Sequence, residues 1–170
     1  PNMGTAGMIS IEENMSIASR RMSKNTLKWG FHKEERKKYY DMIKSLNLGL
    51  EDRLLQKVGL LSGGQRQAIT LLMATLETPK ILLLDEHTAA LDPKTARIVL
   101  EITEKIVTEN KLTTLMITHN MRDAIKYGDR LIMMYGGKII YDVKGEEKKK
   151  LTVEFLLNKF EEMDKITFDN

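Results

Sequence analysis

Apolar residues recur at helical spacing in three segments of the first half of the chain. Ser10 and Glu13 form a capping-box pattern at the start of the first predicted helix, and the second predicted helix spans residues 33–46. The third begins at Ser62, whose hydroxyl suits the N-cap position. The residues predicted to face inward are Ile11, Met15, Ala18, Tyr39, Met42, Ile43, Leu46, Ile69, Leu72, Met73 and Leu76. This pattern predicts a helical region ahead of any strand.

Residues 81–84 are apolar without alternation, which is typical of a strand buried on both faces of a parallel sheet. Asp92 and Pro93 then form a cap and first-turn pair for a long helix. A second apolar and β-branched segment at residues 112–118 predicts another buried strand. The long helix between the strands is expected to turn Ile98, Val99, Ile102 and Ile106 inward.

Two adjacent glycines, Gly136 and Gly137, separate the last two apolar segments before the terminal helix. Because this dipeptide suits a type I′ turn, residues 130–142 predict a β-hairpin. Residues 144–150 are nearly all charged and indicate a solvated linker or a frayed turn. Thr152 then caps an amphipathic helix at the end of the chain.

Length and charge limit the possible functions. A chain of 170 residues with 42% hydrophobic content can bury one core, which corresponds to about one domain. The net charge of +3 is too small to indicate a nucleic-acid partner, and the absence of cysteine excludes disulfides and thiolate metal sites. The basic stretch at residues 20–38 is either a solvated face or a docking surface for a partner or for anionic lipid.

Two carboxylates, Asp85 and Glu86, follow directly after the apolar residues 81–84. Adjacent carboxylates at the end of a buried strand carry a large desolvation cost unless a metal ion, water or ligand offsets their charge. In open parallel sheets the carboxyl edge is where ligands bind. Because His119 follows the second predicted strand, we expect it at the same edge.

Two further glycines, Gly63 and Gly64, let the backbone come close to a ligand. They open the helix that begins at Ser62, and the N-terminus of a helix presents N–H groups and a favourable dipole to an anion. A structural Gly-Gly turn is the alternative interpretation when these residues are considered alone.

Four motifs follow one another in a fixed order. They are LSGGQ at residues 61–65, ILLLDE at residues 81–86, AALD at residues 89–92, and His119 after the apolar segment LTTLMIT. Together they resemble the ATP-binding cassette (ABC) ATPases, over essentially the whole chain. The resemblance implies an α/β fold of the P-loop NTPase, ABC-type class. It divides the chain into a helical signature subdomain, residues 1–77, and the later strands of the parallel core sheet, residues 78–170.

The resemblance also implies roles for these residues in phosphoryl transfer from ATP to water. Asp85 would orient the Mg²⁺ shell, Glu86 would act as general base toward the attacking water, and His119 would contact the γ-phosphate. A nucleotide held by a second cassette in a head-to-tail dimer would be bound by Ser62, Gly63, Gly64 and Gln65. Asp92 would cross that dimer interface.

The sequence departs from the family pattern at several positions: besides the two departures described next, it lacks the glutamine expected before the first segment and the aromatic residue expected to stack on adenine. It contains no G-x-x-x-x-G-K-[ST] phosphate-binding loop, which the resemblance places upstream. We therefore expect the chain to be the C-terminal part of a cassette and to be inactive alone. His87 stands where many members have proline after the two carboxylates, and the sequence assigns no role to it.

The function implied is that of an ATP-binding and ATP-hydrolysing subunit of an ABC transporter, in a bacterial importer. Such a subunit would work from the cytoplasmic face of the cell membrane on a separate transmembrane permease. Two alternatives remain open. One is a permease-free ABC ATPase acting on ribosomes or DNA, although such proteins commonly carry two cassettes or long coiled-coil insertions. The other is a non-catalytic binding and assembly module.

Overall fold

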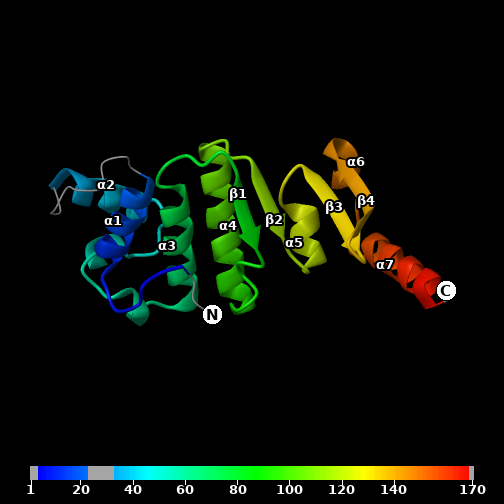
Figure 1. Ribbon diagram of the computed structural model, residues 1–170, viewed down its shortest axis with the longest axis horizontal. Helices are drawn as coiled ribbons and strands as arrows, with labels where there is room; N and C mark the ends of the chain where they lie inside the picture. Colours follow the sequence, from blue (N-terminus) through cyan, green and yellow to red (C-terminus); the bar gives the residue numbers. More distant parts are fainter. Residues whose placement is uncertain (1–3, 23–32, 169–170) are drawn as a thin grey trace. The chain divides into compact units, whose positions relative to one another are not determined.

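The computed structural model describes residues 4–22 and 33–168 (Figure 1). The chain forms two compact units, one extending to Met116 and the other beginning at Ile117. Much of the basic stretch predicted at residues 20–38 lies outside the described residues. Among the helices that are described, none is long and apolar enough to cross a membrane.

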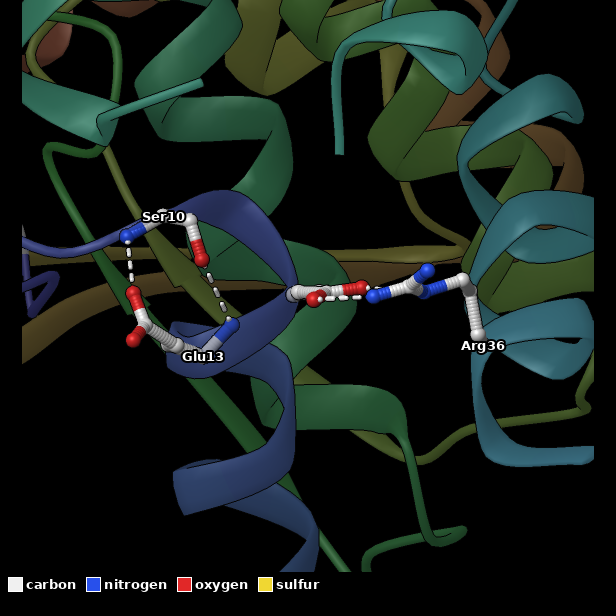
Figure 2. A network of polar contacts seen from close by, with 4 residues as sticks. Ser10, Glu13 and Arg36 are labelled. Carbon is white, nitrogen blue, oxygen red and sulfur yellow. Dashed lines mark hydrogen bonds and ion pairs between the residues drawn. The ribbon is translucent and has the colours of Figure 1, made fainter. Parts of the chain in front are cut away.

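The first helix, α1 (Ile11–Met22), begins with the predicted capping box (Figure 2). The Ser10 hydroxyl accepts a hydrogen bond from the Glu13 amide at 3.2 Å, and the Ser10 amide donates to the Glu13 carboxylate at 2.6 Å. The bond from the Ser10 amide, followed by that from its side chain, lowers the pKa of Glu13. Next to it, the buried Asn14 side chain hydrogen-bonds both backbone groups of Ala6, at 2.8 and 3.0 Å. Local bonds therefore fix where α1 begins and how the preceding loop runs.

The second helix, α2 (Lys33–Lys44), is tied to α1 by a bidentate ion pair, also shown in Figure 2. The Arg36 guanidinium donates to both carboxylate oxygens of Glu12, each at 2.7 Å. The Glu12 side chain is only 4% exposed, and its hydrogen bond raises the pKa of Arg36. Because both oxygens accept hydrogen bonds from Arg36, the buried side chain of Glu12 is not left with unsatisfied acceptors.

The rest of the first unit alternates helix and strand. After the short 3₁₀ helices η1 (Glu51–Arg53) and η2 (Val58–Leu60) come α3 (Gly63–Thr75), β1 (Leu82–Asp85), α4 (Pro93–Glu109) and β2 (Thr114–Ile117). The strands β1 and β2 pair in a two-stranded sheet, with α4 in the connection between them. Helices α3 and α4 pack side by side (Figure 1).

The predicted burial of residues 81–84 on both faces is wrong. Leu82 and Leu84 are 5% and 8% exposed, whereas Leu83 between them is 65% exposed. The buried pair joins the core that also contains residues of α4, while the opposite side of β1 is open to solvent. A continuous apolar run therefore forms a strand that is buried on one face of the described structure.

The predicted inward face of α4 is confirmed at Val99, Ile102 and Ile106, which are at most 7% exposed. It is wrong at Ile98, which is 39% exposed. The buried stripe is instead completed by Leu100 and by the polar Thr103. The helix is thus rotated slightly from the orientation that its apolar residues alone predicted.

One hydrophobic core runs through the first unit, from α1 at Ile11 to Leu112 just before β2. It includes α3, the inner side of β1 and α4, so the compact units do not divide at the expected boundary between residues 77 and 78. The packing of α3 on α4 is the physical reason. The division at residue 77 as a functional one stays a prediction.

The second unit contains the predicted hairpin and the helices around it. Its elements are α5 (Met121–Lys126), β3 (Arg130–Tyr135), β4 (Lys138–Lys144), α6 (Gly145–Lys149) and α7 (Val153–Phe168). Strands β3 and β4 pair antiparallel, and Gly136 and Gly137 have φ values of 55° and 77° in the turn. Positive φ at both positions is what a type I′ turn requires, so the hairpin prediction is confirmed.

Of the two predictions for residues 144–150, the solvated linker is wrong, because part of the segment forms the short helix α6 and buries a lysine. Lys148 is 3% exposed, and its ammonium donates to the carbonyl of Tyr127 at 3.0 Å and to that of Ile125. Burial lowers the pKa of Lys148. These carbonyls lie at the end of α5, where a cation satisfies both the unpaired acceptors and the helix dipole.

Replacing Ser10 by alanine is expected to lower the free energy of unfolding by about 1 kcal/mol, because the Glu13 amide loses its acceptor. Ser45 provides the matched control, since its exposed hydroxyl donates only to the Met42 carbonyl within the same turn of chain. For Ser45→Ala we expect a change within about 0.5 kcal/mol. Urea denaturation followed by circular dichroism measures both. Equal effects of the two substitutions would contradict the capping role of Ser10.

Candidate functional site

Helix α3 starts inside the LSGGQ motif, with Ser62 at its N-cap. The Ser62 hydroxyl accepts from the Gln65 amide at 3.3 Å, and the Gln65 side-chain oxygen accepts from the Ser62 amide at 3.1 Å. The predicted N-cap is therefore confirmed, and Gln65 completes a capping box that the Ser-x-x-Gln spacing could have indicated. In this arrangement the Ser62 hydroxyl hydrogen and the Gln65 NH₂ group are donors that the box itself does not use.

Gly64 is buried against α4, whereas Gly63 is exposed. A Cβ atom at position 64 would lie 2.1 Å from Cγ2 of Thr95 and 3.7 Å from Cγ2 of Val99. The first distance is far below any real contact, so only glycine lets α3 and α4 approach this closely. Sequence reasoning missed this packing reason, because it depends on the separation of two helices. The contribution of Gly64 to nucleotide binding stays a prediction.

Asp92 caps α4, as predicted, with one carboxylate oxygen accepting from the amides of Lys94 and Thr95 at 3.1 and 3.0 Å. The hydrogen bond from the Thr95 side chain, followed by that from its amide, lowers the pKa of Asp92. Thr95 thus bonds Asp92 through its polar groups and meets Gly64 through its methyl group. The first turn of α4 connects the signature helix to the AALD loop.

The two carboxylates stand where β1 ends. Asp85 is the last residue of the strand, and both Asp85 and Glu86 are exposed, as their predicted desolvation cost requires. Glu86 has a φ of 41°, in the left-handed region that residues with a Cβ rarely adopt. Its carbonyl accepts from the Ala89 amide at 3.0 Å, which begins the turn toward Asp92.

His87, to which the sequence gave no role, contacts α4. Its Nε2 lies 3.1 Å from the Thr103 hydroxyl oxygen, and that hydroxyl donates to the Val99 carbonyl at 2.8 Å. Thr103 is 5% exposed and sits in the apolar stripe of α4. A threonine within an otherwise apolar stripe is the only sequence signal of this contact.

His119 belongs to the second unit and is exposed, just after β2. It does not cap the following helix: Asn120 does, accepting from the amides of Arg122 and Asp123 at 3.0 and 3.4 Å. A helix cap is therefore not the role of His119. Its expected place beside Asp85 and Glu86 stays a prediction.

A divalent cation would have to be held without a protein cage. The described residues contain no group of three or more histidine, aspartate or glutamate side chains able to hold a metal ion. Mg²⁺ is commonly bound through one or two carboxylates, with water and substrate phosphates completing its shell. The exposed, hard oxygen ligands of Asp85 fit such a site.

Comparison with protein families gives one match over half of the chain. The model of the family described as ABC transporter matches residues 4–89. The matched residues include the LSGGQ motif, β1 and the two carboxylates at its end.

Two curated relatives show the same similarity. A tyrosine transport ATP-binding protein of Clostridioides difficile is 48% identical over 162 residues, covering 95% of this chain and 64% of that protein. A methionine import ATP-binding protein of Oceanobacillus iheyensis is 36% identical over 153 residues, covering 86% of this chain and 43% of that protein. The chain thus spans less than two thirds of the length of these relatives.

Solved structures of ATP-binding cassettes share the fold. The ADP conformation of one cassette of an ABC transporter matches with a TM-score of 0.72 at 26% identity, covering 91% of this chain and 63% of that one. A dimeric post-hydrolysis cassette bound to ADP and Pi matches with a TM-score of 0.66 at 26% identity, covering 84% and 59%.

The contact between Gly64 and Thr95 can be tested by a substitution and its rescue. Gly64→Ala is expected to lower the free energy of unfolding by about 1–3 kcal/mol, because its new methyl group would overlap Thr95. Thr95→Ser removes the opposing methyl group but keeps the hydroxyl that bonds Asp92. The double variant should therefore recover most of the loss in urea denaturation. Gly63→Ala, at the exposed neighbouring glycine, is the control, and an equal loss there would contradict the explanation.

Proposed function

This chain belongs to the ABC transporter family, and we propose that it is the later part of the ATP-binding subunit of a bacterial importer. The names of the two relatives, tyrosine transport and methionine import, support an amino acid as the solute. ATP hydrolysis would drive that solute through a separate transmembrane permease, with the subunit on the cytoplasmic face of the membrane.

One observation carries the proposal: helix α4 packs against the signature helix and shares a hydrophobic core with strand β1, which ends in the two carboxylates. An ABC ATPase needs both of these elements. The capped signature helix meets α4 at Thr95, and the inner residues of β1 share a core with Ile102 and Ile106. The exposed Asp85 and Glu86 are therefore held at a fixed place relative to the N-terminus of α3 within one compact unit. Catalysis by positioned charges depends on such rigid placement.

The roles proposed for the carboxylates follow from their exposure and chemistry. Glu86 would accept a proton from the water that attacks the γ-phosphate, and Asp85 would hold Mg²⁺, which neutralises the charge on the phosphate oxygens when bound. His119 would contact the γ-phosphate. These assignments rest on the family motifs that end in each residue.

The signature helix would act on a nucleotide held by a second copy of the cassette. Its first amides, at Gly63 and Gly64, lack acceptors within the helix and suit an anion. The Ser62 hydroxyl hydrogen and the Gln65 NH₂ group add two donors without breaking the capping box. Asp92, fixed to the same end of α4, would extend the contact between the two cassettes.

We also propose that these 170 residues do not hydrolyse ATP by themselves. No G-x-x-x-x-G-K-[ST] loop occurs among them, so they supply no backbone cradle for the phosphates. Leu83 on β1 and Leu115 on β2 are 65% and 50% exposed, which supports the packing of a further segment of the ATP-binding protein on this sheet.

Glu86→Gln in the complete ATP-binding protein is expected to lower ATP turnover by roughly 10²-fold or more while ATP still binds. The amide keeps the shape of the side chain but cannot take up the proton. A steady-state phosphate-release assay measures turnover, and equilibrium titration with labelled ATP measures binding. Asp85→Asn serves as comparison, because it should weaken Mg²⁺-dependent nucleotide binding first. Near wild-type turnover by Glu86→Gln would remove Glu86 from the role of base.

The 170-residue chain alone should bind Mg-ATP no more tightly than about 1 mM, which corresponds to about 4 kcal/mol. The reason is the missing phosphate cradle, since the signature helix offers only the second side of a shared site. Isothermal titration calorimetry checks this directly. A micromolar dissociation constant would show that phosphate binding does not need an additional segment.

A further inference from the structure

We propose that His87 is a positioning residue that fixes the backbone of Glu86 by donating a hydrogen bond from Nε2 to Thr103 on α4. The catalytic consequence of this contact rests on the proposed role of Glu86. The restraint of the loop backbone by this bond does not rest on that role, because it concerns only the chain between β1 and α4.

The hydroxyl of Thr103 determines which tautomer of His87 makes the contact. Thr103 donates its hydrogen to the Val99 carbonyl at 2.8 Å, so its oxygen is left to accept. The His87 Nε2 at 3.1 Å must then carry the hydrogen and donate it. Because Thr103 is 5% exposed, water competes poorly for this acceptor.

The backbone of Glu86 is the part of the loop that most needs support. Its φ of 41° places a residue with a full side chain in the left-handed region. Such a conformation persists only where the surroundings hold it, and it is found most often at functional sites. The next residue along the chain is the one anchored to α4, which limits the rotation of the peptide between them.

The loop from residue 86 to residue 92 is therefore attached to one helix at both ends. Asp92 bonds the first turn of α4 through the amides of Lys94 and Thr95, and His87 bonds its middle at Thr103. Two internal bonds, from Ala89 to Glu86 at 3.0 Å and from Leu91 to Thr88 at 3.1 Å, keep the loop compact.

Helix α4 also packs against the signature helix, α3, and so helps to position it. Val99, whose carbonyl accepts from Thr103, is 1% exposed, and its Cγ2 lies 3.7 Å from where a Cβ of Gly64 would be. His87 is thus linked through Thr103 to Val99, a residue of the α4 surface that packs on α3. Loss of the bond from His87 to Thr103 would remove one restraint on the backbone of Glu86 without unfolding either helix.

Two substitutions that remove the bond and two that keep it provide the test. Asparagine at 87 places its amide where Nδ1 lies, so His87→Asn cannot reach Thr103, whereas His87→Gln places an N–H donor near the position of Nε2. Thr103→Val removes the acceptor at almost constant volume, whereas Thr103→Ser keeps it. Hydrogen–deuterium exchange of the amides at residues 86–91 in the 170-residue chain is the first measurement.

We expect exchange at residues 86–91 to be roughly three- to tenfold faster in His87→Asn and Thr103→Val, as loss of one hydrogen bond permits. His87→Gln and Thr103→Ser should stay near the wild type. The amides of residues 66–72 in α3, which contain none of the substituted positions, serve as internal reference and should not change. Wild-type exchange at residues 86–91 in both His87→Asn and Thr103→Val would overturn the proposal, as would equal acceleration by His87→Gln.

The second measurement is steady-state ATPase activity of the complete ATP-binding protein. His87→Asn and Thr103→Val should lower kcat roughly tenfold with little change in KM, since misplacement of a catalytic group affects the chemical step. The double variant should be no slower than either single one, because both remove the same bond. Faster exchange with an unchanged kcat would support the anchoring by His87 and count against Glu86 as the base.

Discussion

The close approach of α3 and α4 at Gly64 and Thr95 is the constraint on which the proposed site depends. A Cβ at position 64 would lie 2.1 Å from the Thr95 methyl group, so at this point the side chain of Thr95 packs directly against the backbone of α3. Packed interiors do not deform continuously, and a contact this tight transmits displacement rather than absorbing it. We therefore expect the N-terminus of the signature helix and the first turn of α4 to move together.

This rigidity links residues that would serve two different nucleotides. The donors at Ser62 and Gln65 would face the nucleotide of a second cassette, while Glu86 would act on the nucleotide of its own. Both are fixed to α4, the first through Gly64 and Thr95 and the second through the loop that ends at Asp92. A movement that brings the signature helix toward its ligand would thus carry the Glu86 loop with it, as the proposed action of two cassettes on shared nucleotides would require.

The sequence predicted local features well, because their causes lie within a few residues. The caps at Ser10, Ser62 and Asp92 depend on hydrogen bonds across three residues, and the hairpin depends on two glycines with positive φ. Burial was predicted less well. The apolar run at residues 81–84 was assigned two buried faces, and Lys148 was assigned to a solvated linker. The burial of these residues depends on which other element covers each face of the strand or helix. A local sequence pattern does not contain that information.

The resemblance to a known family identified the candidate residues of the site. The contacts that place them depend on the separation of α3 and α4 and on the tautomer of His87. His87 is the clearest case, since it stands where the resemblance implies a proline. Proline would confine the preceding residue to extended backbone. Histidine lifts that restriction, and Glu86 here has a φ of 41°. The bond to Thr103 then restrains the loop through a side chain. A hydrogen bond can open whereas a ring cannot, so this loop keeps a defined resting geometry while remaining able to rearrange.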